Sequence, residues 1–135
     1  MVIKLSRELV QSDFVKKVEE ISGQNMLSCY QCGKCSAGCP SVAEMDIIPS
    51  QIIRLVQLGQ EDKIENYKTM WLCAACNQCA VRCPRGVDLA KIMEAVRQLV
   101  LRRNENQVEP SKLSQELLEE LPPIALISNF RKFTS

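Results

Sequence analysis

Two copies of one cysteine spacing constrain this chain more than any other feature. Each copy follows the pattern C-x2-C-x2-C-x3-C-P, the first from Cys29 to Pro40 and the second from Cys73 to Pro84. All eight cysteines lie in these two runs. Three thiolates at steps of three residues surround one turning loop, where they can bind three irons of a cubane [4Fe-4S] cluster. The duplicated pattern therefore predicts two [4Fe-4S] clusters.

The fourth cysteine of each run stands just before the proline, where the chain is already leaving the loop. In two-cluster proteins with this spacing, that cysteine binds the cluster of the other run. We therefore predict an exchanged ligation that ties the two halves of the domain together. One cluster would be held by Cys29, Cys32, Cys35 and Cys83, and the other by Cys73, Cys76, Cys79 and Cys39.

Three other uses of cysteine fit this pattern less well. Zinc, the main alternative, usually takes two separated C-x2-C pairs in a tetrahedron, which closely stepped triplets satisfy poorly. Disulfides need an oxidising compartment, and residues 1–6 lack the apolar stretch of a secretion signal, so we expect a cytoplasmic protein. A redox C-x-x-C pair would not require eight cysteines.

Length, composition and charge limit the size of the fold and the kinds of partner that the chain can bind. A chain of 135 residues forms one small domain, or a domain with a tail, and 46% hydrophobic but only 4% aromatic residues predict an aliphatic core. The formal charge of +1 falls to about −3 when two oxidised clusters are counted, which gives no reason to expect nucleic-acid binding. No apolar run reaches membrane-spanning length. Basic residues after the second run would either offset the cluster charge or form a solvated helix face: Arg82, Arg85, Lys91, Arg97, Arg102 and Arg103.

Helical periodicity dominates outside the cysteine runs. Ser12 or Asp13 can cap a first helix that ends at Gly23. Pro49 opens a second helix that ends at Gly59, and residues 61–67 form a third. Asp88 caps the longest helix, over residues 89–104. With little β signal, we predict an all-α fold, a helical ferredoxin-like domain over residues 1–104.

Two details of the loops are predicted from the repeat. Gly33 and Asn77 hold the same place in the two runs and both tolerate positive φ, so each loop should contain a left-handed turn that points N–H groups at sulfur. Trp71, just before the second run, is most simply a packing residue.

The C-terminal part, residues 105–135, is predicted to be a separate helix and tail. Residues 104–110 suggest a hinge, and Ser111 can cap a helix that ends at Pro122-Pro123. The following segment, Ile124 to Ile127 with Phe130, is too apolar for a floppy tail. We expect it to dock on a partner rather than fold back on the domain.

Signatures of catalysis are missing from the sequence. It contains no histidine, no G-x-G-x-x-G loop and no P-loop, and every cysteine is assigned to a cluster. We therefore expect no catalytic residue and no direct small-molecule substrate. The chain should carry electrons and leave bond-making to another subunit.

Several stretches resemble HdrC, the electron-transfer subunit of heterodisulfide reductase. These are the first run CYQCGKCSAGCP, the segment from Met45 through Gly59, Trp71 through Asp88 around the second run, and the tail LPPIALISNFRK, so that the resemblance covers about Ser12 to Lys132. The paired cysteine runs alone mark the broader helical-ferredoxin group, which includes subunits of fumarate reductases and glycolate oxidases.

The resemblance implies a non-catalytic electron-transfer subunit. In that family, HdrC passes electrons through two [4Fe-4S] clusters from the flavin-bearing A subunit to the catalytic B subunit, which reduces the CoM-S-S-CoB heterodisulfide in methanogens. The Cys-Cys pairs of that catalytic partner are absent here. Two alternatives stay open: a relay subunit of a related complex with another disulfide or sulfur substrate, and a free ferredoxin-like carrier.

Overall fold

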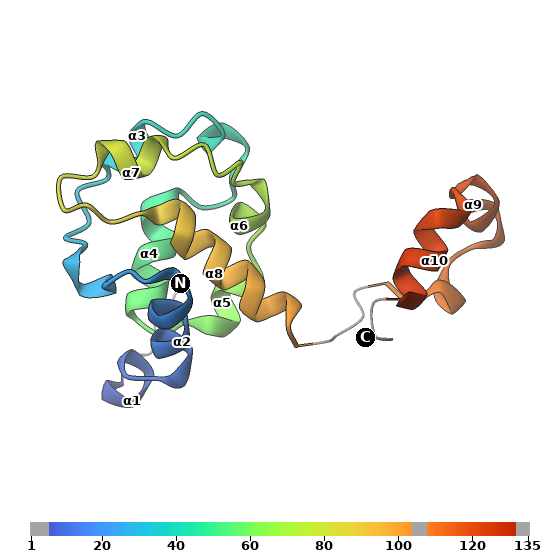
Figure 1. Ribbon diagram of the computed structural model, residues 1–135, viewed down its shortest axis with the longest axis horizontal. Helices are drawn as coiled ribbons and strands as arrows, with labels where there is room; N and C mark the ends of the chain where they lie inside the picture. Colours follow the sequence, from blue (N-terminus) through green and yellow to red (C-terminus); the bar gives the residue numbers. More distant parts are fainter. Residues whose placement is uncertain (1–5, 104–107, 132–135) are drawn as a thin grey trace. The chain divides into compact units, whose positions relative to one another are not determined.

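The computed structural model describes residues 6–103 and 108–131. Every regular element within these ranges is a helix, and no strand occurs in them, which confirms the all-α prediction. The chain divides into two compact units, Met1–Val100 and Leu101–Ser135. The first unit contains both cysteine runs (Figure 1).

Short helices alternate with cysteine loops in the first unit. In chain order they are α1 (Arg7–Val10), α2 (Asp13–Ser22), η1 (Met26–Ser28), α3 (Lys34–Ala37), η2 (Val42–Glu44), α4 (Pro49–Gln57), α5 (Glu61–Glu65), α6 (Thr69–Leu72), α7 (Gln78–Arg82) and α8 (Leu89–Leu101).

Most helix boundaries arise from the residues that predicted them. Pro49 is the first residue of α4, where its fixed φ is already helical. Gly23 and Gly59 follow α2 and α4 with φ of 64° and 63°, a conformation that glycine adopts without a steric penalty. Asp88 caps α8, because its Oδ1 accepts a hydrogen bond from the backbone N–H of Lys91 at 3.2 Å. The helix ends at Leu101, three residues earlier than predicted.

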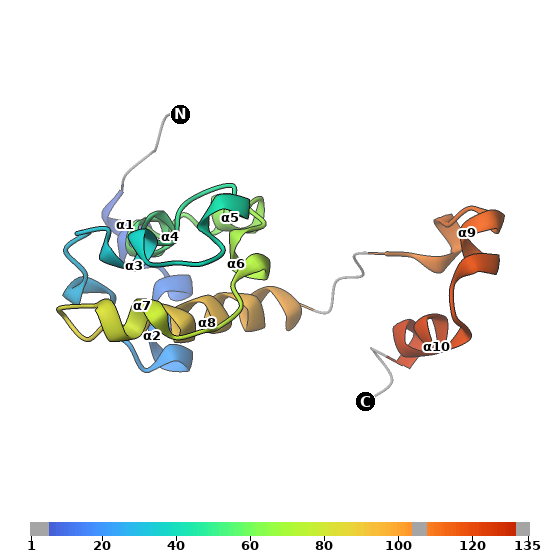
Figure 2. The same ribbon diagram turned by 90° about the horizontal axis from the view of Figure 1, so that it is seen from above.

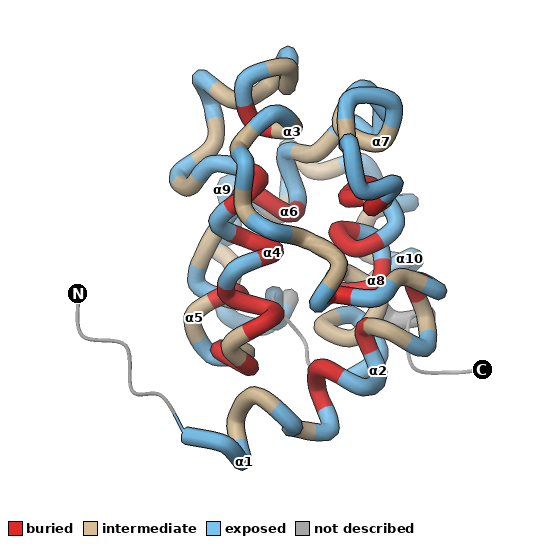
Figure 3. Tube along the Cα trace, turned by 90° about the vertical axis from the view of Figure 1, so that its left-hand side faces the viewer, coloured by how far each residue is buried: buried red, intermediate tan, exposed pale blue. Residues whose placement is uncertain are grey.

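The core is aliphatic, as expected, and lies between the two longer helices that follow the cysteine runs. Ile52 and Val56 of α4 and Ile92 and Val96 of α8 are almost completely buried. Phe14 and Val18 bring α2 against the same core. Figure 3 shows buried residues concentrated along α4 and α8, beneath α3 and α7.

The two halves of this unit repeat one arrangement. In each half a short helical turn precedes the cysteine loop, a one-turn helix follows it, and a longer helix packs below. The one-turn helices α3 and α7 lie side by side in all three views (Figures 1, 2 and 3). Buried Ser36 fastens α3 to the start of α4, since its Oγ lies 2.9 Å from the backbone N of Ser50. The duplicated sequence thus folds into a duplicated structure.

The second unit contains η3 (Pro110–Lys112), α9 (Gln115–Glu120) and α10 (Pro123–Arg131). Ser114, not the predicted Ser111, caps α9, because its Oγ accepts a hydrogen bond from Leu117 N at 3.4 Å. Both serines precede the same apolar pattern, and the sequence did not distinguish them. Pro123 begins a new helix over the apolar segment, which was predicted only as an arm. The predicted boundary near residue 104 lies outside the described residues.

Candidate functional site

Each cysteine loop turns through two left-handed residues. The predicted pair is confirmed, with φ of 78° at Gly33 and 61° at Asn77. The structure adds Gln31 and Ala75, at φ of 63° and 50°, which hold equivalent places before the second cysteine of each run. Left-handed backbone at a residue other than glycine costs on the order of 1 kcal/mol. Neither glutamine nor alanine signals such a conformation, so the sequence carried no indication of it.

Backbone N–H groups of the loops and of the helices that follow them point at sulfur. The amides of Lys34 and Ser36 donate to Cys32 and Cys35 in the first loop. The amides of Ala80 and Ala90 both donate to Cys79 in the second loop. Hydrogen bonds of this kind stabilise a thiolate and, in a bound cluster, raise its reduction potential.

The fourth cysteine of the second run receives a similar bond after the chain has left the loop. The backbone N of Val87 lies 3.3 Å from Sγ of Cys83. Val87 is buried, so this amide holds the sulfur at the edge of the core.

Thiol acidity differs between the loop positions. Burial raises the pKa of Cys35 and of Cys79 above the ordinary thiol value. The pKa of Cys32 is lowered, first by the backbone N–H of Lys34 and also by the Tyr30 hydroxyl. The second cysteine of each run, Cys32 or Cys76, is exposed, whereas the other six cysteines are partly buried.

One small cavity brings together four cysteines from both runs. Cys39 of the first run lies in its wall with Cys73, Cys76 and Cys79 of the second run. These four residues are the predicted ligand set of the second cluster. The rest of the wall is largely apolar, with contributions from Met45, Pro49, Ala74, Leu89, Ala90 and Met93. A cubane bound here would be bordered by apolar side chains, which exclude water from its sulfurs.

The last cysteine of the second run, Cys83, lies near residues of the first run. Cys29, Cys35 and Cys83 all pack against the apolar core. The Tyr30 hydroxyl pairs with Cys32, and the charge of Cys83 also acts on it, so that both raise the pKa of Tyr30. Gln31 Nε2 lies 3.6 Å from Sγ of Cys29. The fourth cysteine of each run therefore lies beside the other run.

Trp71, just before the second run, is more exposed than the sequence predicted. That side chain is 46% exposed, so its expected packing role is wrong. Its neighbour Met70 is buried instead, at 1% exposure. The first run shows the same division, with Met26 buried and Leu27 exposed. In α6 the buried residues are Thr69 and Met70, and Trp71 lies on the side of this one-turn helix that faces away from the core. The flexible methionine side chain fills the core position.

The basic residues after the second run lie in different environments. Lys91 is exposed and pairs with Asp88 at 3.9 Å. Arg97 turns inward, with its side chain 16% exposed, and its guanidinium bonds to the backbone of the second cysteine run. Arg85 Nε donates to the carbonyl of Ser28 at 3.4 Å, which joins the end of the second run to the start of the first.

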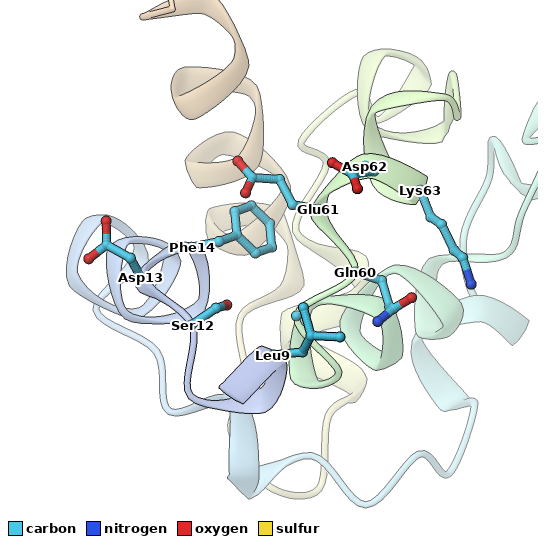
Figure 4. A pocket seen from close by; sticks show the side chains of 9 residues that line it. Leu9, Ser12, Asp13, Phe14, Gln60, Glu61, Asp62 and Lys63 are labelled. Atoms are coloured by element: carbon cyan, nitrogen blue, oxygen red, sulfur yellow. The ribbon is translucent and has the colours of Figure 1, made fainter. Parts of the chain in front are cut away.

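An open groove lies away from the cysteines. Figure 4 shows its lining side chains, which come from α1, α2 and α5, among them Leu9, Phe14 and Glu61. Gly59 forms part of the same wall, close to the backbone of Leu9. No cysteine lines this groove.

The described residues contain neither a site for a single metal ion nor a helix that could cross a membrane. No three cysteine or acidic side chains in residues 6–103 and 108–131 are placed to hold a single metal ion. Within the same ranges, no helix combines the length and apolarity needed to cross a membrane. The donor set itself is eight free thiols with directed N–H groups, and this chemistry fits iron-sulfur clusters.

Comparison with known proteins identifies the cysteine-containing segment. Residues 28–88 match a family model described as a 4Fe-4S dicluster domain. The C subunit of the H2:CoB-CoM heterodisulfide,ferredoxin reductase of Methanothermobacter marburgensis is 33% identical over 63 residues, which are 47% of this chain and 34% of that protein. The protein of the same name from Methanothermobacter thermautotrophicus is 32% identical over 63 residues, with the same coverage.

The matched stretch thus spans about a third of the length of these relatives. Residues 28–88, which match the family model, contain the duplicated cysteine loops and their left-handed turns. Residues 28–88 are therefore a 4Fe-4S dicluster domain that binds two [4Fe-4S] clusters, and the chain is an iron-sulfur protein similar over 47% of its length to the HdrC subunits of heterodisulfide reductases.

Proposed function

We propose that this chain is the relay subunit of a heterodisulfide reductase complex. Electrons would enter from a flavin-bearing A subunit and leave to a catalytic B subunit that reduces the CoM-S-S-CoB heterodisulfide. The observation that carries the proposal is the pair of cysteine loops packed side by side through α3 and α7. Two neighbouring clusters in one small domain suit the passage of single electrons.

The ligand sets of the proposal are those predicted from the spacing. Cys29, Cys32, Cys35 and Cys83 hold one cluster, and Cys73, Cys76, Cys79 and Cys39 hold the other. The shared cavity of the second set and the approach of Cys83 to Tyr30 support this exchange. When bound, the clusters supply one-electron redox chemistry, and the protein supplies the thiolates, their N–H partners and the apolar surroundings.

The C-terminal helix supports membership in a complex. Ile124 and Ile127 of α10 are 66% and 47% exposed. Exposed branched aliphatic side chains on one helix are typical of a surface that another protein covers. We propose that residues 105–135, through α10, dock on a neighbouring subunit.

Anaerobic purification of the tagged chain from its native cells tests the assembly. We expect it to elute in a complex with a flavoprotein and a second cysteine-rich protein. Reduced clusters in that complex should be reoxidised when CoM-S-S-CoB is added, as followed by visible absorbance. Elution as a monomer with full cluster content would instead identify a free carrier.

Substitutions in α10 separate docking from cluster binding. The double variant Ile124→Glu and Ile127→Glu should keep its iron and sulfide but lose its partners. Ser128→Ala on the same helix is the matched control, since its hydroxyl only bonds back to the carbonyl of Ile124. Reoxidation by another disulfide, with none by CoM-S-S-CoB, would assign the chain to a related complex with a different substrate.

A further inference from the structure

Each cysteine run is held from below by one long polar side chain. In the first half, Nε2 of Gln57 on α4 donates to the carbonyl oxygens of Met26 and Cys29, at 2.7 and 3.0 Å. In the second half, Nη1 of Arg97 on α8 donates to the carbonyls of Met70 and Cys73, both at 3.1 Å.

The two arrangements are counterparts within the duplicated fold. Met26 and Met70 are the buried residues before each run, and Cys29 and Cys73 are the first cysteines. In each half the donor comes from the longer helix that follows the run, and it bridges the same two carbonyls. The geometry is therefore the same in the two halves, while the donor changes from a neutral amide to a guanidinium cation.

The guanidinium cation lies against the backbone at the start of the second run, where it contacts the carbonyls of Met70 and Cys73. The Arg97 side chain is only 16% exposed, so water screens it less than it screens a surface arginine. Its Nη2 pairs with Glu94 Oε2 at 2.8 Å, and the Glu94 side chain is 52% exposed. The carboxylate offsets part of the positive charge, but from the solvent side of the guanidinium. In the first half, the cation on α4 is exposed Arg54, which donates to Oε1 of Gln57 at 3.4 Å.

We propose that Arg97 is a positioning residue that raises the reduction potential of the cluster held by Cys73, Cys76 and Cys79. The inference rests on the ligand sets proposed above. Adding one electron to a cluster increases its negative charge, so a nearby fixed cation favours the reduced state. Gln57 gives the same hydrogen bonds to the other run without that charge. The duplicated fold thereby makes two structurally similar sites electrostatically different.

Redox titration followed by EPR tests this on the full-length protein reconstituted with clusters, with dithionite as the electron donor. Arg97→Gln copies the first half, and we expect one midpoint potential to fall while the other stays in place. Gln57→Arg is the reciprocal change, and it should raise the other midpoint. Arg97→Lys keeps the charge and should stay closer to the wild-type potential than Arg97→Gln.

Glu94→Gln provides the decisive variant, because Arg97 keeps its bonds to the carbonyls of Met70 and Cys73. The carboxylate that accepts from Arg97 and Gln98 becomes a neutral amide, which still offers an acceptor oxygen. The midpoint potential of the cluster held by Cys73, Cys76 and Cys79 should rise in Glu94→Gln. The same midpoint should fall in Arg97→Gln. A purely structural Arg97 would give lower cluster content in Arg97→Gln and no shift in Glu94→Gln. Unchanged midpoints in a fully loaded Glu94→Gln protein overturn the proposal.

Failure of the proposed function has a different signature. Iron and acid-labile sulfide analysis of the wild-type protein should give about eight of each for two cubanes. A lower content means that the ligand sets are wrong, whatever the midpoints of the variants.

Discussion

The side chain of Arg82, from the second cysteine run, lies directly over Gly38 of the first run. A Cβ added at Gly38 would stand 2.5 Å from Cδ of Arg82. Gly38 immediately precedes Cys39, and Arg82 immediately precedes Cys83. The two residues that lead into the fourth cysteines are therefore in contact, and this closeness of the two run ends is compatible with an exchange of ligands between the runs.

Removing one fourth cysteine should damage the distant cluster. For Cys39→Ser, we expect loss of the cluster held by Cys73, Cys76 and Cys79, because Cys39 lines their cavity. EPR of the reduced protein should retain the signal of the other cluster. Cys83→Ser is the matched variant and should show the opposite loss. Selective loss of the cluster nearest in sequence to each substitution would contradict the exchange.

Gly59→Ala should detach the N-terminal segment. A Cβ there would lie 1.9 Å from the carbonyl oxygen of Leu9, a backbone atom that cannot rotate away (Figure 4 shows this region). Gly23→Ala is the matched control, with a similar φ but nothing within 4 Å. We expect about 1 kcal/mol of destabilisation at Gly23 and a larger loss at Gly59. Hydrogen exchange at residues 7–12 should rise only in Gly59→Ala, and equal exchange in both variants would refute the contact.

Asp46 should stabilise the helix before the second run. Its carboxylate accepts hydrogen bonds from the backbone N–H groups of Lys68 and Thr69, at 2.7 and 3.0 Å. Since these amides begin α6, the residue acts as a distant helix cap, and Asp46→Ala should cost about 1 kcal/mol in thermal unfolding. Asp46→Asn keeps one acceptor oxygen and should lose less.

The carboxylate of Asp46 should also make the stability of the protein depend on pH. Partial desolvation raises the pKa of Asp46, but hydrogen bonds from Thr69 and from the two amides outweigh it and lower the pKa overall. Its stabilisation is therefore complete above the ordinary carboxyl pKa of about 4 and is lost as the pH falls through the lowered value. The stability difference between wild type and Asp46→Ala should be constant from about pH 8 to 5. A difference that already declines across that interval would argue against this cap.

Truncating either buried methionine, Met26 or Met70, should lower the stability more than truncating the exposed apolar residue next to it. Met26→Ala and Met70→Ala each empty a filled core position, and we expect losses of about 2–5 kcal/mol. Leu27→Ala and Trp71→Ala remove exposed side chains and should stay within about 0.5 kcal/mol of wild type. Anaerobic thermal unfolding measures all four, and a large loss in Trp71→Ala would restore the packing role predicted from sequence.

The sequence by itself determined the local features of this protein. Steps of three between cysteines, glycine and asparagine at the left-handed positions, Pro49 at a helix start and Asp88 at a cap all act within a few residues, and the structure contains each of them. The dicluster prediction also followed from spacing alone, and the family match confirms it.

Only the tertiary structure decided which distant groups meet. The cap that Asp46 provides for α6 and the matched roles of Gln57 and Arg97 depend on how segments far apart in the chain pack together. The hydrogen bonds among these contacts join residues 22 to 31 positions apart, and no local propensity encodes their register. The prediction that Trp71 is a packing residue failed for the same reason. A tryptophan side chain favours burial, but the packing of α6 buries Met70 and leaves Trp71 exposed.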